Sequence, residues 1–167
     1  VNPNVGMTFG AGLRSILRQD PNIIMVGEIR DKETVEVAVR ASLTGHLVLS
    51  TMHTNDALSS VTRMLDMGVE PFLVASSLSG VVAQRLVRRV CRDCAEAQEP
   101  TKREIDIFSK RGISIETVWK GRGCSSCNMT GYRGRLAIHE VLSVDNELRR
   151  AIMNEESVTA LREIAVR

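Results

Sequence analysis

Four cysteines in two matched pairs carry the clearest chemical signature in this sequence of 167 residues. Two residues separate Cys91 from Cys94 and Cys124 from Cys127, and 29 residues lie between the pairs. Each Cys-x2-Cys turn presents two thiolates to one ion, and two such turns complete the tetrahedron that zinc prefers. The N-terminus lacks the layout of a signal peptide, and disulfides are rare in reducing compartments. The spacing therefore favours zinc over disulfides, and four thiolates predict a structural ion with no open position.

A carboxylate and a histidine follow two short apolar runs. Glu28 comes shortly after the run at residues 23–26, and His53 follows the run at residues 47–51. Both runs are typical of buried parallel strands, and ligands of α/β sheets gather beyond the carboxyl ends of such strands. A carboxylate there can orient or deprotonate a water or hold one through Mg²⁺, and His53 could stabilise a γ-phosphate. The alternative is an ordinary surface ion pair between Glu28 and Arg30, with His53 as a polar loop residue.

Other charged residues are harder to assign from their spacing. His46 precedes the second run, and at roughly 3.3 Å per residue a regular strand would hold it about 23 Å from His53. We therefore expect the two histidines to lie at opposite edges of the sheet and His46 to be structural. Arg14 and Arg18 share one helix face because they are four residues apart, but a solvated face explains them as well as a ligand does.

The elements that must position these groups follow from hydrophobic periodicity. An apolar face predicts a helix over residues 8–18, and Asp31 is a plausible N-cap for a helix over residues 32–43. Strand, helix and strand with short connections form a βαβ unit, so the two strands should be parallel with a right-handed crossover. Further helices are expected over residues 56–65, 71–87, 146–153 and 157–166, and a strand over residues 136–142.

Charge divides the chain into segments. Residues 85–135 hold 12 Lys and Arg against 6 Asp and Glu, although the whole chain has a formal net charge of only +2. We therefore expect an α/β segment at residues 1–84, a cysteine segment at 85–136 and a mainly helical segment at 137–167. The basic residues either compensate the charge of a tetrathiolate zinc site or meet an acidic partner or anionic lipid. Aromatic residues make up only 3%, which argues against binding of nucleic acid.

Several long stretches resemble one family, the secretion ATPases that power type II secretion and type IV pilus assembly. Residues 13–31 are similar to its Walker B region and read LRSILRQDPNIIMVGEIRD. Residues 44–55 are similar to its His box and read TGHLVLSTMHTN. The resemblance continues through DMGVEPF at residues 66–72 and QRLVR at residues 84–88. It implies a partial RecA-like P-loop NTPase domain of the α/β class, followed by a four-cysteine zinc subdomain and C-terminal helices.

The resemblance also implies residue roles. Glu28 would be the Walker B glutamate, with Gly27 standing where many ATPases have Asp, and His53 would belong to the catalytic His box. The residues expected to contact the nucleotide are Gly27, Arg30, Thr51 and Thr54. ATP and Mg²⁺ would be needed in the full-length protein, and zinc would be held by Cys91, Cys94, Cys124 and Cys127. Assembly ATPases of the family carry this cysteine subdomain and retraction ATPases lack it, which favours an assembly or secretion motor.

One family motif is missing from the printed sequence. No Gly is followed by Lys, so the phosphate-binding loop Gly-x4-Gly-Lys-Ser/Thr is absent. Together with an initial Val, this predicts a C-terminal fragment that does not hydrolyse ATP alone.

The resemblance implies a homo-hexameric motor for pilin or pseudopilin assembly. It would be cytoplasmic, peripheral at the inner membrane and in contact with membrane proteins of the machine. The resemblance leaves open which process the motor drives: protein secretion, pilus assembly or DNA uptake. The alternatives are a non-enzymatic zinc module that binds a protein partner and a nucleic-acid-binding zinc ribbon.

Overall fold

A computed structural model describes residue 2 and residues 6–166, so Val1 and Arg167 lie outside the described residues. The chain divides into two compact units. Unit 1 comprises Val1–Ala83 and His139–Arg167, and unit 2 comprises Gln84–Ile138. Among the described residues, no helix combines the length and the apolar character that crossing a membrane requires.

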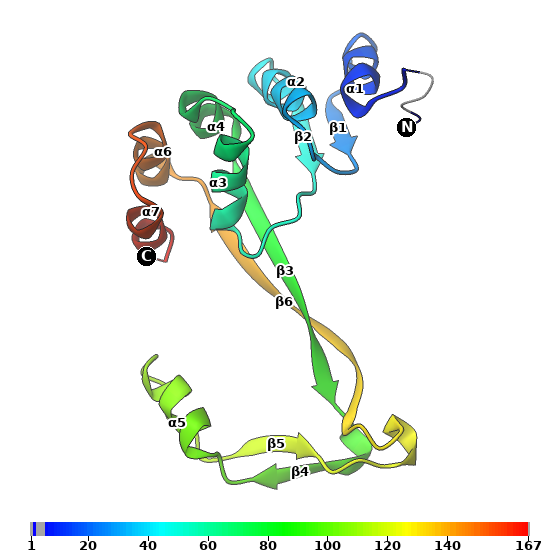
Figure 1. The fold of residues 1–167 in the computed structure, drawn as a ribbon, viewed down its shortest axis with the longest axis vertical. Helices are drawn as coiled ribbons and strands as arrows, with labels where there is room; N and C mark the ends of the chain where they lie inside the picture. Colours follow the sequence, from blue (N-terminus) through cyan, green and yellow to red (C-terminus); the bar gives the residue numbers. More distant parts are fainter. Residues whose placement is uncertain (1, 3–5, 167) are drawn as a thin grey trace. The chain divides into compact units, whose positions relative to one another are not determined.

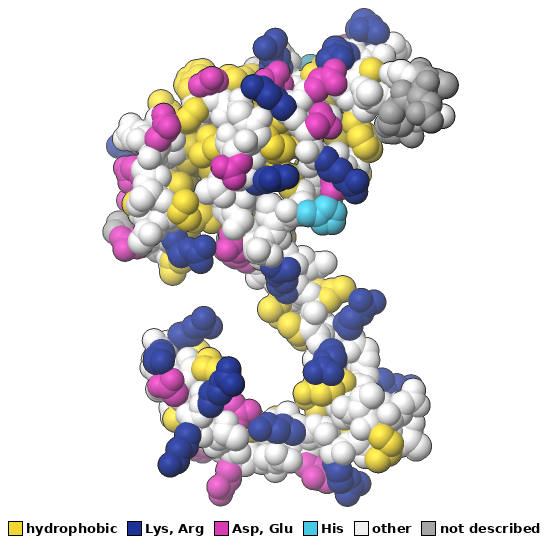
Figure 2. Space-filling model, viewed as in Figure 1, with side chains coloured by type: hydrophobic (Ala, Val, Ile, Leu, Met, Phe, Trp, Pro, Cys, Tyr) yellow, Lys and Arg dark blue, Asp and Glu magenta, His cyan; other side chains and the backbone are white. Residues whose placement is uncertain are grey.

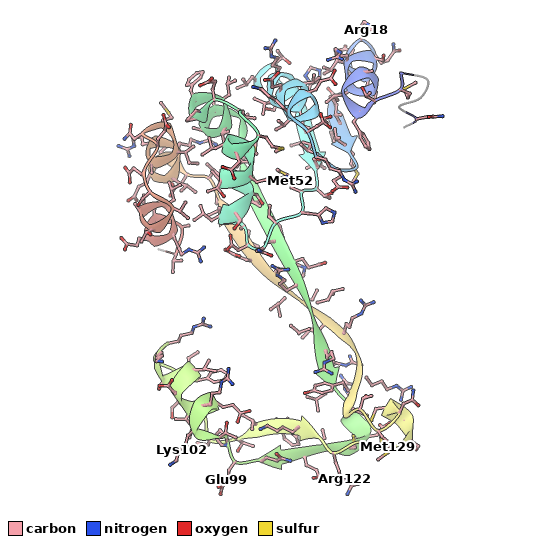
Figure 3. All side chains as sticks on the ribbon, viewed as in Figure 1. Arg18, Met52, Glu99, Lys102, Arg122 and Met129 are labelled. Atoms are coloured by element: carbon pink, nitrogen blue, oxygen red, sulfur yellow. The ribbon has the colours of Figure 1, made fainter. Side chains whose placement is uncertain are left out.

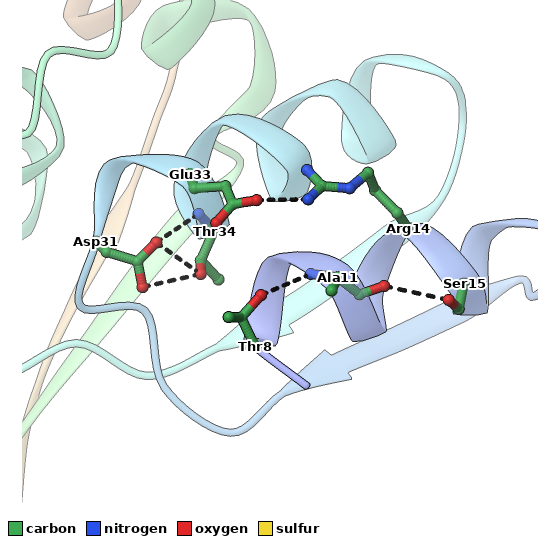
Figure 4. Close-up of polar contacts among 7 residues, drawn as sticks. All are labelled: Thr8, Ala11, Arg14, Ser15, Asp31, Glu33 and Thr34. Atoms are coloured by element: carbon green, nitrogen blue, oxygen red, sulfur yellow. Dashed lines mark hydrogen bonds and ion pairs between the residues drawn. The ribbon is translucent and has the colours of Figure 1, made fainter. Parts of the chain in front are cut away.

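Unit 1 contains the predicted βαβ arrangement (Figure 1). Strand β1 (Ile23–Val26) pairs in parallel with β2 (Leu47–Ser50), and helix α2 (Lys32–Leu43) connects them. The carboxylate of Asp31 caps α2 by accepting a hydrogen bond of 2.8 Å from the backbone N–H of Thr34 (Figure 4). The parallel pairing and the N-cap are therefore confirmed.

Only one face of this sheet is buried, so the prediction of two buried strands is wrong for the other face. Ile24 and Val26 pack with Leu13 of helix α1 (Phe9–Leu17) and with residues of α2. The alternate side chains are exposed, with Met25 74% accessible. Side chains of a strand alternate between faces, and the described helices cover only one of them. The other exposed members of the uncovered face are Ile23, Leu47 and Leu49.

A second core in unit 1 joins elements far apart in the sequence. Helices α3 (Leu58–Asp66) and α4 (Pro71–Ser77) pack with α6 (Asn146–Met153) and α7 (Val158–Ala165). The largest fully buried side chains in this core are Val35, Val61, Val74, Leu148 and Ile152. The predicted helices near residues 56, 146 and 157 are confirmed, and the C-terminal helices share a core with the helices that follow β2.

The predicted helix over residues 71–87 is wrong beyond α4. The backbone turns extended at Leu78, and strand β3 (Gly80–Val90) begins two residues later and pairs with β6 (Tyr132–Ser143). Gly and β-branched residues such as Val81 disfavour a helix, and a distant partner strand decides between the two states. The strand predicted over residues 136–142 is confirmed within β6.

Unit 2 is built from short elements around the cysteines. Strand β4 (Ala95–Gln98) pairs antiparallel with β5 (Val118–Gly121), between the 3-10 turns η2 (Arg92–Cys94) and η3 (Ser125–Cys127). Helix α5 (Lys102–Ser109) begins with a capping box between Thr101 and Glu104. Hydrogen bonds from the backbone and hydroxyl of Thr101, followed by Lys120, lower the pKa of Glu104 to about 2. Figure 3 labels Lys102 at the start of α5 and Arg122 and Met129 beside the cysteine turns.

Candidate functional site

The carboxylate of Glu28 lies between two basic side chains at the carboxyl ends of β1 and β2. Its Oε1 is 3.0 Å from Nε2 of His53, and its Oε2 is 2.5 Å from a guanidinium nitrogen of Arg30. The side chain of Glu28 is 17% exposed, whereas that of His53 is 88% exposed. Three residues that the sequence analysis selected from two strand ends are therefore brought into direct contact.

The neighbours of Glu28 favour its charged form. The hydrogen bond from Arg30 has the largest effect and lowers the pKa of Glu28. Burial raises this pKa by a smaller amount, and the charges of Arg30 and then His53 add to the lowering. The carboxyl is therefore ionised well below neutral pH. An ionised carboxylate is the form that can accept a proton from water or bind a cation.

Backbone and hydroxyl contacts fix the two strand ends together. The hydroxyl of Thr51 donates to the carbonyl oxygen of Gly27 at 2.7 Å, and the N–H of Ile29 donates to the carbonyl of Thr51 at 3.0 Å. The hydroxyl of Thr54 instead lies 2.9 Å from that of Ser60 on α3. The roles of Gly27, Thr51 and Thr54 toward a nucleotide stay predictions.

A pocket of about 260 Å³ opens beside Glu28. Its lining residues are Glu28, Ile29, Arg30, Met52, His53 and Arg63. Figure 3 labels Met52 in the segment that follows β2. Arg63 lies on α3, and the sequence analysis missed it. In the sequence, Arg63 is only a basic residue in the helix that follows the His53 segment. Its place in the pocket depends on how α3 packs, which the sequence pattern does not show. Two guanidinium groups and a histidine give the pocket the chemistry of an anion site.

The remaining basic candidates have structural contacts in unit 1. Nδ1 of His46 lies 2.9 Å from the carbonyl oxygen of Ala41, at the end of α2, which agrees with the expected structural role. Arg14 of α1 pairs with Glu33 of α2 (Figure 4). Arg18 contacts the hydroxyl of Ser15 at 3.4 Å. None of these three basic residues lines the pocket beside Glu28.

The four cysteines of unit 2 form a compact cluster. Their sulfur atoms all lie within 4.8 Å of one another. The separations are 3.9 Å for Cys91–Cys124, 3.9 Å for Cys94–Cys127 and 3.7 Å for Cys124–Cys127. Four sulfurs bound at about 2.3 Å to one tetrahedral zinc ion would lie about 3.8 Å apart. The cluster therefore has the dimensions of a tetrathiolate zinc site.

The backbone around Cys127 favours a thiolate. Burial would raise the pKa of Cys127, but hydrogen bonds from the N–H groups of Cys124 and Gly131, followed by the neighbouring thiols, lower it to about 6. Burial raises the pKa of Cys94 to about 12, and the adjacent thiols add to this effect. Four sulfurs this close cannot all ionise without a cation between them, and a divalent metal removes that obstacle.

Two glycines allow the chain to close around the cluster. Gly131 has φ +76°. A Cβ atom built on Gly121 would lie 2.0 Å from the carbonyl oxygen of Gly131. Any larger residue at Gly121 would therefore push the two segments apart. Figure 2 shows Lys and Arg side chains spread over the visible face of this unit, in keeping with its excess of basic residues.

Comparisons with known proteins agree with this arrangement. The family described as "Type II/IV secretion system protein" matches residues 1–167. The chain is 55% identical over 161 residues to the "Type II secretion system ATPase E" of Vibrio cholerae, covering 96% of this chain and 32% of that protein. It is 53% identical over 170 residues to the "Type IV pilus assembly ATPase PilB" of Thermus thermophilus, covering 100% of this chain and 19% of that protein.

Solved structures show the same fold. The pilus retraction motor PilT with bound ADP has a TM-score of 0.62 and 27% identity, over 94% of this chain and 34% of that chain. The Legionella pneumophila ATPase DotB has a TM-score of 0.61 at 24% identity. The fold is thus of the RecA-like α/β class, followed by a four-cysteine cluster. The chain belongs to the family of type II/IV secretion system proteins, which confirms the resemblance, and it spans about a third or less of the length of these relatives.

Proposed function

We propose that this chain is part of a motor ATPase that hydrolyses ATP to drive pilin or pseudopilin assembly. The observation that carries the proposal is the contact of Glu28 with His53 and Arg30 at the carboxyl edge of β1 and β2. Relatives named secretion and pilus assembly ATPases support it, and the two names occur at similar identity, 55% and 53%.

The chemistry would be attack of a water on the γ-phosphate of ATP. Glu28 orients the water and accepts its proton, and His53 positions Glu28 or contacts the transferred phosphoryl group. Arg30 and Arg63 face the negative charge that builds up on the phosphate oxygens. Gly27, Thr51 and Thr54 would border the nucleotide at the same edge. Mg²⁺ would neutralise the phosphates when bound, and zinc held by the four cysteines would fix the fold of unit 2.

We further propose that these residues work within a longer chain, the full-length motor, that supplies a phosphate-binding loop. Support comes from the absence of any Gly-Lys pair in the sequence and from coverage of only 32% of the Vibrio cholerae relative. The 167 residues alone should neither bind ATP at micromolar concentration nor hydrolyse it. Isothermal titration calorimetry and a phosphate-release assay check this, and micromolar binding would contradict it.

The proposed assembly is a cytoplasmic homo-hexamer, peripheral at the inner membrane and in contact with the platform proteins of the machine. The excess of Lys and Arg in unit 2 suits an acidic protein surface or anionic lipid. Sedimentation with vesicles distinguishes these two partners. If the protein binds anionic vesicles no more strongly than neutral ones, anionic lipid is excluded. Analytical ultracentrifugation of the full-length motor with nucleotide tests the hexamer.

His53→Gln in the full-length motor should lower kcat about tenfold with little change in KM, because His53 acts on the reacting groups rather than on binding. The matched control is His46→Gln, a change of the same type at the opposite end of β2, where the side chain contacts Ala41 instead. Steady-state ATPase assays of both variants test the assignment. Equal losses in the two variants would contradict it.

A further inference from the structure

The segment that carries His53 is held at both ends although His53 itself is exposed. At its start, the hydroxyl and carbonyl of Thr51 bond to Gly27 and Ile29 at the end of β1. Further along, the hydroxyl of Thr54 contacts Ser60 at 2.9 Å. His53 therefore takes its position from this short segment and from the start of α3.

The start of α3 is capped by a carboxylate from a distant part of the chain. Oε2 of Glu140 on β6 accepts a hydrogen bond of 3.1 Å from the backbone N–H of Ala57, across 83 residues of sequence. Ala57 is fully buried, and the first N–H groups of a helix have no partners within it. A carboxylate at this place satisfies one of them and interacts favourably with the helix dipole.

A second contact from the C-terminal helices reaches the same turn. Oδ1 of Asp56 accepts a hydrogen bond of 2.7 Å from the N–H of Ser59, while its Oδ2 lies 3.2 Å from the guanidinium of Arg162 on α7. The bonds from Ser59, followed by Arg162, lower the pKa of Asp56. The turn between His53 and α3 is thus fixed from two later elements, β6 and α7.

We propose that Glu140 is a positioning residue for the reaction, which holds the His53 segment against Glu28 by capping the start of α3. The inference rests on the proposed ATPase function and extends it to a residue outside the pocket. Glu140 is not among the residues that line the pocket, and its carboxylate bonds to the start of α3, so it acts through the His53 segment. Arg162 supports the same turn through Asp56.

The contact itself is tested without ATP, in the 167-residue chain. Hydrogen exchange followed by NMR should show the Ala57 amide exchanging about tenfold faster in Glu140→Ala, the loss expected when a hydrogen bond to a charged acceptor is removed. Glu140→Gln keeps an acceptor oxygen and should stay close to wild type. The matched control is Glu163→Ala. This change removes an exposed glutamate of α7 whose side chain makes no hydrogen bond or ion pair with the described residues. Unchanged exchange in Glu140→Ala would overturn the proposal.

The consequence for catalysis is tested in the full-length motor. Glu140→Ala should lower kcat about tenfold with KM for ATP nearly unchanged, and Glu140→Gln should restore most of the rate. Because Glu140 acts through His53, the double variant His53→Gln/Glu140→Ala should lose no more than His53→Gln alone. Fully additive losses would show an effect independent of His53 and overturn the proposal. An inactive wild-type motor would refute the proposed function, whereas the exchange experiment would still decide whether Glu140 holds the segment.

Discussion

Removing the metal from the cysteine cluster should unfold unit 2 and leave unit 1 folded. Across Gln84–Ile138, all of which the structure describes, the only buried apolar side chains are those of Cys91, Cys94 and Cys127. Such a unit has no aliphatic core, so we expect the metal proposed for the cysteine cluster to supply most of its stability. Structural zinc contributes about 10–16 kcal/mol to small zinc domains at neutral pH. Cys127→Ser, or a strong chelator, should therefore abolish the fold of unit 2.

The single Trp of the sequence makes this result easy to measure. Trp119 lies on β5 in unit 2, so its fluorescence and the protease sensitivity of Gln84–Ile138 report on that unit. The core of unit 1 should keep its NMR signals, because the hydrophobic cluster that holds Val35 and Leu148 contains no cysteine. The matched control for Cys127→Ser is Ser126→Ala, which changes an exposed residue of the same turn, η3, and should have no effect. Unchanged fluorescence and proteolysis after complete metal removal would contradict the assignment.

Glu28→Gln should lower kcat of the full-length motor about 100- to 10,000-fold, the range for loss of a general base. Gln has the same shape but cannot accept a proton, and it also loses the ion pair with Arg30. KM for ATP should change little, because the water, not the nucleotide, is the partner of this group. Steady-state phosphate release, with nucleotide binding measured separately, checks both parts.

The matched control for Glu28 is another glutamate of unit 1. Glu36 on α2 is also paired with a basic residue, Lys32, at 3.7 Å, yet it lies away from the pocket. Glu36→Gln should leave kcat within about twofold of wild type, as expected for an exposed ion pair. A comparable loss in both variants would mean that Glu28 acts through charge or stability rather than on the reacting water.

Local signals predicted the first half of unit 1 well. The apolar runs, the Asp31 cap and the short connections depend on neighbours within a few residues, so they define β1, α2 and β2 before any tertiary contact is known. The cysteine spacing was equally informative, because Cys-x2-Cys geometry is local and only the approach of the two turns is not.

Two features of the fold depend on long-range contacts and could not be predicted from local sequence. Residues 80–87 carry enough apolar side chains for a helix, but pairing with β6, some fifty residues later, makes them a strand. The exposed face of Met25 depends on what packs beside the sheet, which an apolar run does not encode.

The same limit applies to the site. Glu28 and His53 follow strands and could be found from pattern alone. Arg63 lines the pocket only because α3 packs beside it, and Glu140 meets the start of α3 only because β6 returns there. No local motif marks either residue.

The central claim is that the carboxyl edge of β1 and β2 is the place of ATP hydrolysis. A crystal structure of the full-length motor with Mg²⁺ and a non-hydrolysable ATP analogue tests it most directly. The γ-phosphate is expected in the pocket beside Glu28, with a water between this carboxylate and the phosphorus and with His53 or Arg63 in contact with phosphate oxygens. A nucleotide bound away from this edge, with Glu28 more than one water from the γ-phosphate, would contradict the account.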